Sequence, residues 1–167
     1  IAGLWRSGSG RIIQPAASDM MFLPQRPYML LGSLRSQLLY PLQDRQITDE
    51  ELLRSLESVN LPDIANQFGG LDAELDWAKV LSVGEQQRVA LARVLLAAPR
   101  YAILDEATSA LDIANEDSLY RQLAASGTTL VSVGHRPSIL KYHPQVLELA
   151  GSGGWQLYAA RDYRFDR

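Results

Sequence analysis

Short apolar runs alternate with longer amphipathic segments along the chain. The runs have the length of β-strands, and most of them stop at a turn residue or an acidic pair. They cover residues 11–14, 20–23, 101–104, 128–133, 145–149 and 155–158. Between them, apolar residues recur at helical spacing behind residues that commonly cap helices. This alternation predicts an α/β fold with a largely parallel sheet.

The expected helices gather in the middle of the chain. Ser33 can cap a helix over residues 34–40, and Thr48 and Glu51 have the spacing of a capping box. Further helices are expected over residues 82–97 and 113–125. We therefore expect residues 28–100 to form a helical subdomain inserted into a core, which residues 1–27 and 101–167 build.

Composition excludes some functions. The chain has 167 residues, a net charge of −3 and a pI near 5.4, which give no bulk attraction to nucleic acid or anionic membranes. It contains no cysteine, which excludes disulfides, thiolate metal sites and cysteine catalysis. No stretch approaches the roughly 20 apolar residues that a membrane-spanning helix needs.

The most informative motif is an apolar strand that ends in two acids. Residues 101–112 read Tyr-Ala-Ile-Leu-Asp-Glu-Ala-Thr-Ser-Ala-Leu-Asp. A parallel strand brings its carboxyl end to the ligand edge of the sheet. There Asp105 could hold Mg²⁺ through water, and Glu106 could orient or deprotonate an attacking water. The alternative is structural: Asp105 caps a helix and Glu106 complements the helix dipole.

A second motif opens the helix over residues 82–97. Residues 81–88 read Leu-Ser-Val-Gly-Glu-Gln-Gln-Arg, in which Ser82 and Glu85 have capping-box spacing. Free N–H groups at this helix end suit an anion such as a γ-phosphate, and Gly84 would let the backbone approach it closely. A capped surface helix is again the alternative.

Together the two strings resemble the ATPase domains of ABC transporters, a family with a P-loop NTPase fold. Residues 81–88 are similar to the signature motif, and residues 102–106 to the Walker B strand with its catalytic glutamate. Residues 109–112, ending in Asp112, are similar to the D-loop. The resemblance implies ATP and Mg²⁺ as ligands. It also implies nucleotide contacts from Asp112 and from Ser82, Val83, Gly84 and Glu85. Val83 and Glu85 depart from the usual glycine and glutamine.

Two further positions follow from the resemblance. Gln25, after the run at residues 20–23, resembles the Q-loop glutamine, which reaches the Mg²⁺ site. His135, after the run at residues 128–133, resembles the H-loop histidine, which bonds the γ-phosphate and supports catalysis. The structural alternatives are a solvated turn glutamine and an exposed loop histidine. His143 matches no motif and is expected at the surface.

The phosphate loop Gly-x-x-x-x-Gly-Lys-Ser/Thr is missing. The glycines within residues 3–11 are not followed by the lysine that such a loop requires. In the resembled family, a segment like residues 1–12 comes just after the phosphate-loop helix. We therefore expect a truncated ATPase domain that lacks its N-terminal strands and does not hydrolyse ATP alone.

The amino-acid sequence around the motifs resembles one branch of the family. Leu4-Trp5, residues 69–75, Asp76-Trp77 and the tail at residues 151–155 are similar to the peroxisomal fatty-acyl (adrenoleukodystrophy-type) transporters and their bacterial relatives. The branch implies a transmembrane domain fused N-terminally and a second ATPase domain paired head to tail. It places the ATPase on the cytoplasmic face of a membrane.

Two other functions remain to be weighed. DNA-repair and chromosome ATPases share these motifs but insert long coiled coils, and no sustained heptads lie between Gln25 and Ser82. A degenerate, non-catalytic interaction module could also lack the phosphate loop. The retained Glu106 and His135 favour an ATPase, and no nucleic-acid partner is expected.

Overall fold

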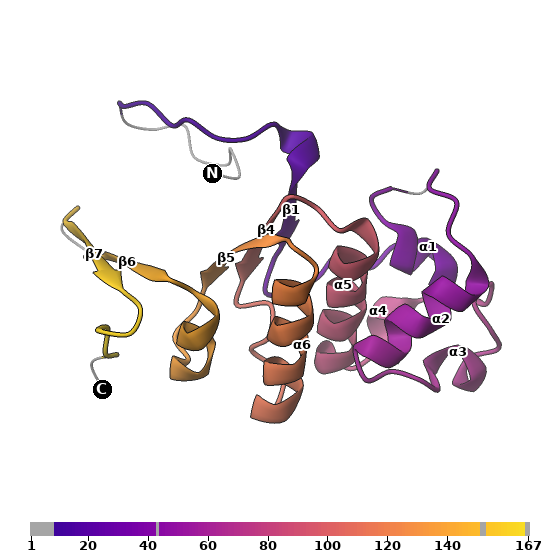
Figure 1. Ribbon diagram of the computed structural model, residues 1–167. Helices are drawn as coiled ribbons and strands as arrows, with labels where there is room; N and C mark the ends of the chain where they lie inside the picture. Colours follow the sequence, from indigo (N-terminus) through magenta and orange to yellow (C-terminus); the bar gives the residue numbers. More distant parts are fainter. Residues whose placement is uncertain (1–8, 43, 151–152, 166–167) are drawn as a thin grey trace.

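A three-stranded parallel sheet forms the centre of the fold (Figure 1). The computed structural model describes residues 9–42, 44–150 and 153–165. In the sheet, β4 (Tyr101–Asp105) lies between β1 (Met20–Leu23) and β5 (Thr129–Val133), and both neighbours pair with it in parallel. All three strands follow predicted apolar runs. The α/β prediction is therefore confirmed.

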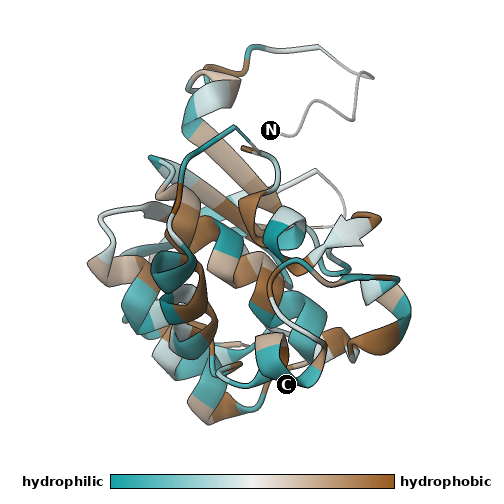
Figure 2. Cartoon of the chain, turned by 90° about the vertical axis from the view of Figure 1, so that its right-hand side faces the viewer, coloured by the Kyte–Doolittle hydropathy of each residue, from teal (hydrophilic) through white to brown (hydrophobic). Residues whose placement is uncertain are grey.

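One face of this sheet is packed and the other is open. Leu23, Ala102 and Leu104 are buried on the face covered by α5 (Val83–Ala97) and α6 (Ile113–Ala125). On the other face Phe22, Ile103 and Val131 form one cross-strand row, in which Phe22 is 38% and Val131 42% exposed. Parallel sheets are usually covered on both faces. Figure 2 shows the strands largely in the apolar colour and the helices banded with teal.

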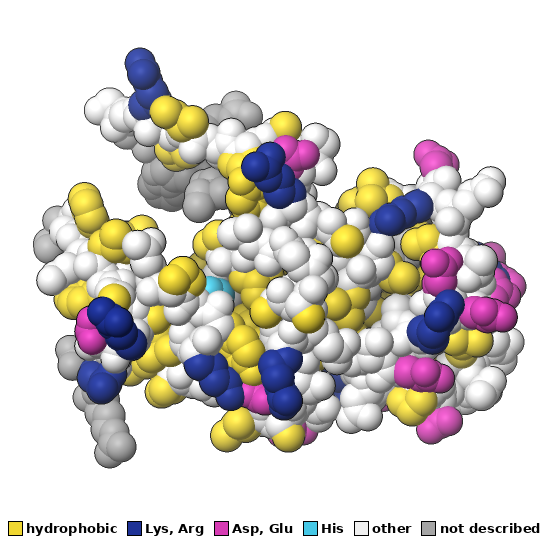
Figure 3. All heavy atoms as spheres, in the orientation of Figure 1, with side chains coloured by type: hydrophobic (Ala, Val, Ile, Leu, Met, Phe, Trp, Pro, Cys, Tyr) yellow, Lys and Arg dark blue, Asp and Glu magenta, His cyan; other side chains and the backbone are white. Residues whose placement is uncertain are grey.

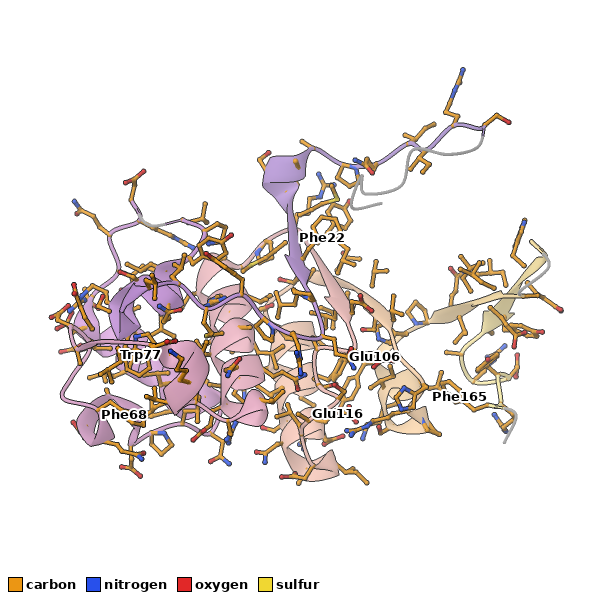
Figure 4. All side chains as sticks on the ribbon, turned by 180° about the vertical axis from the view of Figure 1, so that it is seen from behind. Phe22, Phe68, Trp77, Glu106, Glu116 and Phe165 are labelled. Carbon is orange, nitrogen blue, oxygen red and sulfur yellow. The ribbon has the colours of Figure 1, made fainter. Side chains whose placement is uncertain are left out.

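Four short helices of the described residues lie on one side of α5, and α1 and α2 pack against it (Figure 1). They are α1 (Leu34–Leu39), α2 (Asp49–Ser58), α3 (Ile64–Gln67) and α4 (Trp77–Val80). A two-stranded ladder of β2 (Gly32–Ser33) and β3 (Glu74–Leu75) ties them together. Fully buried Trp77 lies at the centre, where its indole N–H donates to the Gly32 carbonyl and its ring meets Phe68 edge-on (Figure 4).

The helix beginnings follow their capping residues, as predicted. Ser33 caps α1, and Thr48 and Glu51 form a complete capping box on α2. Ser82 and Glu85 do the same on α5, with the Ser82 N–H donating to the Glu85 carboxylate over 2.8 Å. These bonds satisfy N–H groups that a helix end leaves without intrahelical partners.

A β-hairpin extends beyond the β5 edge of the sheet (Figure 1). It pairs β6 (Gln145–Leu149) antiparallel with β7 (Trp155–Ala159), and η2 (Pro137–Tyr142) connects it to β5. Both strands were predicted. Leu147 pairs with Leu157 and Leu149 with Trp155, and all four are more than half exposed. Yellow side chains are visible over the hairpin in Figure 3.

One predicted strand is wrong. Residues 11–14 form no strand; Ile12 and Ile13 are 73% and 88% exposed, and the described residues offer them no partner strand. The chain instead reaches β1 through the short 3-10 turn η1 (Ala17–Asp19). The Leu4-Trp5 motif and Gly151-Ser152 lie outside the described residues. Among the helices that the structure describes, none is long and apolar enough to cross a membrane.

Candidate active site

The carboxyl ends of the three parallel strands bring the candidate residues together. Leu23, Asp105 and Val133 end their strands at the same edge of the sheet. The loops that follow carry Gln25 after β1, Glu106 after β4 and His135 after β5. Figure 4 shows Glu106 at this edge. Residues far apart in the sequence therefore meet at the position where α/β folds bind ligands.

The carboxylate of Glu106 contacts the side chains of both Gln25 and His135. The Gln25 amide nitrogen (Nε2) donates to one Glu106 carboxylate oxygen over 2.8 Å, and His135 Nδ1 lies 3.3 Å from the other. The His135 side chain is 72% exposed and that of Glu106 32%, so both remain accessible to a ligand. The arrangement orients the carboxylate without burying it.

The backbone of Glu106 is in an unusual conformation. Its φ is +46°, in the left-handed region that non-glycine residues rarely adopt. Two bonds hold it there: its N–H donates to the Val133 carbonyl over 2.9 Å, and its carbonyl accepts from the Ser109 N–H over 3.0 Å. Such conformations cluster at functional sites, where the surrounding structure over-determines them.

Asp105 and Gln25 supply oxygen atoms of the kind that Mg²⁺ prefers. Asp105 is the exposed last residue of β4, directly before Glu106. The Gln25 amide can bond Glu106 through its nitrogen while its oxygen remains able to bind a cation. Within the described residues no group of three or more His, Cys, Asp or Glu could hold a metal alone. A bound Mg²⁺ would therefore need water or phosphate ligands as well.

The signature-like residues form a separate group at the start of α5. The Ser82 hydroxyl donates to Glu85 over 2.6 Å, which occupies both side chains in the cap, and Val83 is 48% exposed. No hydrogen bond joins residues 82–85 to Gln25, Glu106 or His135 in the part of the chain that the structure describes. A Cβ on Gly84 would lie 3.3 Å from the Ala110 carbonyl oxygen. Gly84 thus permits close packing against the D-loop-like segment.

Asp112 begins α6. Its carboxylate accepts from the Asn115 backbone N–H over 2.9 Å and from the Asn115 side chain. These hydrogen bonds, the backbone bond first, lower the pKa of Asp112 below its ordinary range. Asp112 is therefore ionised at neutral pH, with its side chain occupied in capping.

A buried acidic residue beside the site was not predicted. Glu116 on α6 is 1% exposed and lines the same pocket as Glu106; both are labelled in Figure 4. Its carboxylate accepts from the Thr108 hydroxyl over 2.8 Å and from the Ser138 hydroxyl, and Arg136 lies 3.4 Å away. Arg136 also donates to the Ser109 and Leu111 carbonyls. Glu116 thus joins the loop after β4 to the loop after β5.

His143 was predicted at the surface, and the structure shows its side chain only partly exposed there. Its ring lies 6.0 Å from that of Tyr120 in an edge-on arrangement. Its buried Nε2 has no hydrogen-bond partner among the described residues. Burial lowers the pKa of His143 below its ordinary value. Apolar neighbours on both sides of residue 143 were the only sequence signal for this burial.

A parallel sheet whose carboxyl edge carries a glutamine, two acids and a histidine defines an α/β domain with its candidate site at the edge where such sheets bind ligands. Residues 4–109 match the family model described as ABC transporter, and the chain belongs to this family. The fold is that of an ABC ATPase domain. A bacterial Atm1-family ABC exporter with ATP bound has a similar structure, with a TM-score of 0.74 and 25% identity over 87% of this chain and 26% of that one.

Two relatives confirm the predicted branch. An uncharacterized ABC transporter ATP-binding protein of Synechocystis is 58% identical over 94% of this chain and 24% of its own length. The chloroplastic ABC transporter D family member 2 of Arabidopsis thaliana is 42% identical over 90% of this chain and 28% of its own length. The chain thus spans about a quarter of the length of the relatives it matches.

Proposed function

We propose that this chain is part of the ATP-hydrolysing domain of a transporter, in which ATP hydrolysis drives movement of a substrate across a membrane. The observation that carries the proposal is that the Glu106 carboxylate contacts two side chains, Gln25 and His135, which come from two other loops. A structural cap would not need either contact. Membership of the ABC transporter family supports the transport role.

Glu106 is proposed as the residue that orients and deprotonates the attacking water. Its carboxylate is accessible and oriented by Gln25, which suits a general base. His135, on the other side of Glu106, is placed to donate a hydrogen bond to the transferred phosphoryl group. Charge on that group grows in the transition state, so a fixed donor stabilises it.

Asp105 and Gln25 are proposed as the residues that hold Mg²⁺, Asp105 through water. When bound, the ion neutralises charge on the ATP phosphates. The Gln25 amide would then link the ion to Glu106, with its oxygen on the metal and its nitrogen on the carboxylate. Through this shared amide, Gln25 would orient the proposed base relative to the cation site.

Ser82, Val83, Gly84, Glu85 and Asp112 are proposed to contact ATP held by a second ATPase domain. No hydrogen bond joins them to Glu106 among the described residues, which supports a contact with ATP on another domain. The phosphate loop would come from residues outside this chain. We further propose that residues 28–100 act as the helical subdomain, that a transmembrane domain is fused N-terminally, and that the ATPase works at the cytoplasmic face.

The decisive experiment uses the full-length protein with Glu106→Gln. We expect ATP turnover to fall by at least about a hundredfold, because a neutral amide replaces the carboxylate that is proposed as the base. Labelled ATP should still bind. Glu57→Gln makes the same chemical change at an exposed position on α2 and should keep wild-type turnover. Wild-type turnover by Glu106→Gln would refute the role of Glu106, and an inactive wild-type protein would favour a non-catalytic module.

A further inference from the structure

Gln87 is a buried amide that joins three parts of the molecule. It lies in the second turn of α5 and is 1% exposed. Its amide nitrogen donates to the Gln25 backbone carbonyl over 2.9 Å and to the Ser109 hydroxyl over 3.2 Å. Its amide oxygen accepts from the Ala110 N–H over 3.0 Å. One side chain therefore connects α5 to the loops after β1 and β4.

These contacts lead directly to the proposed base. Gln87 holds the backbone of Gln25, and the Gln25 side chain holds Glu106 over 2.8 Å. Gln87 also holds residues 109 and 110, and Ser109 bonds the Glu106 carbonyl. A shift of α5 would therefore reach Glu106 through its side-chain partner and through its backbone.

A buried side chain with only a packing role would not need this chemistry. An apolar residue of the same length would fill the space beside α5 without hydrogen-bond requirements. Gln87 instead makes three hydrogen bonds, each to a backbone or side-chain group of a loop next to the site. Among the described residues, the side chain of neighbouring Gln86 bonds the Ala78 and Leu81 carbonyls, which belong to its own helical region.

We propose that Gln87 is a positioning residue, which sets the location of Gln25 and of residues 109 and 110 relative to the signature-bearing helix α5. Its side chain bonds protein groups of the loops beside the site, and it acts on Glu106 through Gln25. Movement of α5 and orientation of Glu106 are thereby coupled. This inference rests on the proposed ATPase function.

The test replaces Gln87 by Glu in the full-length protein and measures ATP turnover against ATP concentration. The carboxylate keeps the size of the side chain and its bond from Ala110 but has no N–H to donate to Gln25. We expect kcat to fall by about tenfold or more with KM for ATP changed less than about threefold. Gln122→Glu is the matched control, since the Gln122 amide nitrogen donates to the Ser58 carbonyl and to the Ser118 hydroxyl, neither of which belongs to the candidate site.

A double substitution distinguishes a positioning effect, which acts through Gln25, from a general disruption of the structure. If Gln87 acts through Gln25, adding Gln87→Glu to Gln25→Ala should lower kcat little further, because the group being positioned is already gone. Multiplying losses would overturn the proposal, as would wild-type kcat in Gln87→Glu. Should Gln87→Glu not fold, Gln87→Met, which also lacks donors, decides in the same assay. The inference on Gln87 would be rejected, and the proposed ATPase function kept, if the wild type is active, Glu106→Gln is inactive and Gln87→Glu is fully active.

Discussion

Glu116 gives the sharpest test of how the loops after β4 and β5 are held together. Its carboxylate is 1% exposed and accepts hydrogen bonds from Thr108 and Ser138, with Arg136 at 3.4 Å. Replacing Glu116 by Ala removes the acceptor of two hydroxyls and the partner of one guanidinium. Of the groups left behind, the Thr108 hydroxyl is buried, whereas Arg136 and Ser138 remain partly exposed to water.

The expected loss follows from these contacts. Removing one partner of a buried ion pair costs about 3–5 kcal/mol. The Arg136 side chain is 32% exposed and keeps its bonds to backbone carbonyls, so the lower end, about 3 kcal/mol, applies here. Glu116→Gln keeps an acceptor and loses mainly the charge, so we expect about 1–2 kcal/mol.

The measurement is the thermal midpoint of unfolding of the ATPase domain, followed within the full-length protein. At about 2–4 °C per kcal/mol, Glu116→Ala should lower the midpoint by roughly 6–12 °C and Glu116→Gln by less. Glu57→Ala, on the exposed face of α2, controls for loss of a carboxylate and should change it little. A Glu116→Ala variant within about 1 °C of wild type would show that the network does not stabilise these loops.

Two other predictions concern close packing and pH. Gly84→Ala would place a Cβ 3.3 Å from the Ala110 carbonyl oxygen, so residue 110 must shift. We expect ATP turnover to fall several-fold as a result. Stability should change less, because a gain of about 0.8 kcal/mol in helix propensity offsets the loss from the shift. Unchanged turnover would contradict this. Burial lowers the pKa of His143 from 6.5, so its contribution to stability is complete above pH 6.5 and declines as pH falls toward the folded-state pKa. Urea titrations from pH 7.5 to 5 should show this decline in wild type and less of it in His143→Phe; equal declines would refute it.

The helices and strands could be predicted because they are specified by residues that lie close together in the sequence. Ser82 with Glu85 and Thr48 with Glu51 specify helix beginnings through bonds three residues apart, and both boxes form. The run before Asp105 had the length and the acidic end of a buried strand, and it lies at the centre of the sheet. Residues 11–14 had the apolar content of a strand, but a strand also needs a partner, which local pattern does not supply.

Contacts between distant segments could not be predicted in this way. Gln87 and Glu116 have the sequence appearance of ordinary polar positions on helices, and only the packing of α5 and α6 beneath the sheet buries them. His143 carried no motif and was expected at the surface, whereas Tyr120 from α6 covers one side of its ring. Burial of a polar residue is decided by what the tertiary fold brings against it.

The left-handed backbone at Glu106 shows how those contacts serve the site. A non-glycine residue at φ +46° is strained by about 1–2 kcal/mol, and an extended or helical alternative would turn the side chain elsewhere. The bond to Val133 holds the residue to the neighbouring strand, and the bond from Ser109 closes the turn behind it. Ser109 is bonded to Gln87, and its carbonyl accepts from Arg136 of the Glu116 network. The two buried polar residues that the sequence did not reveal therefore support the same turn, and through it the direction of the proposed base.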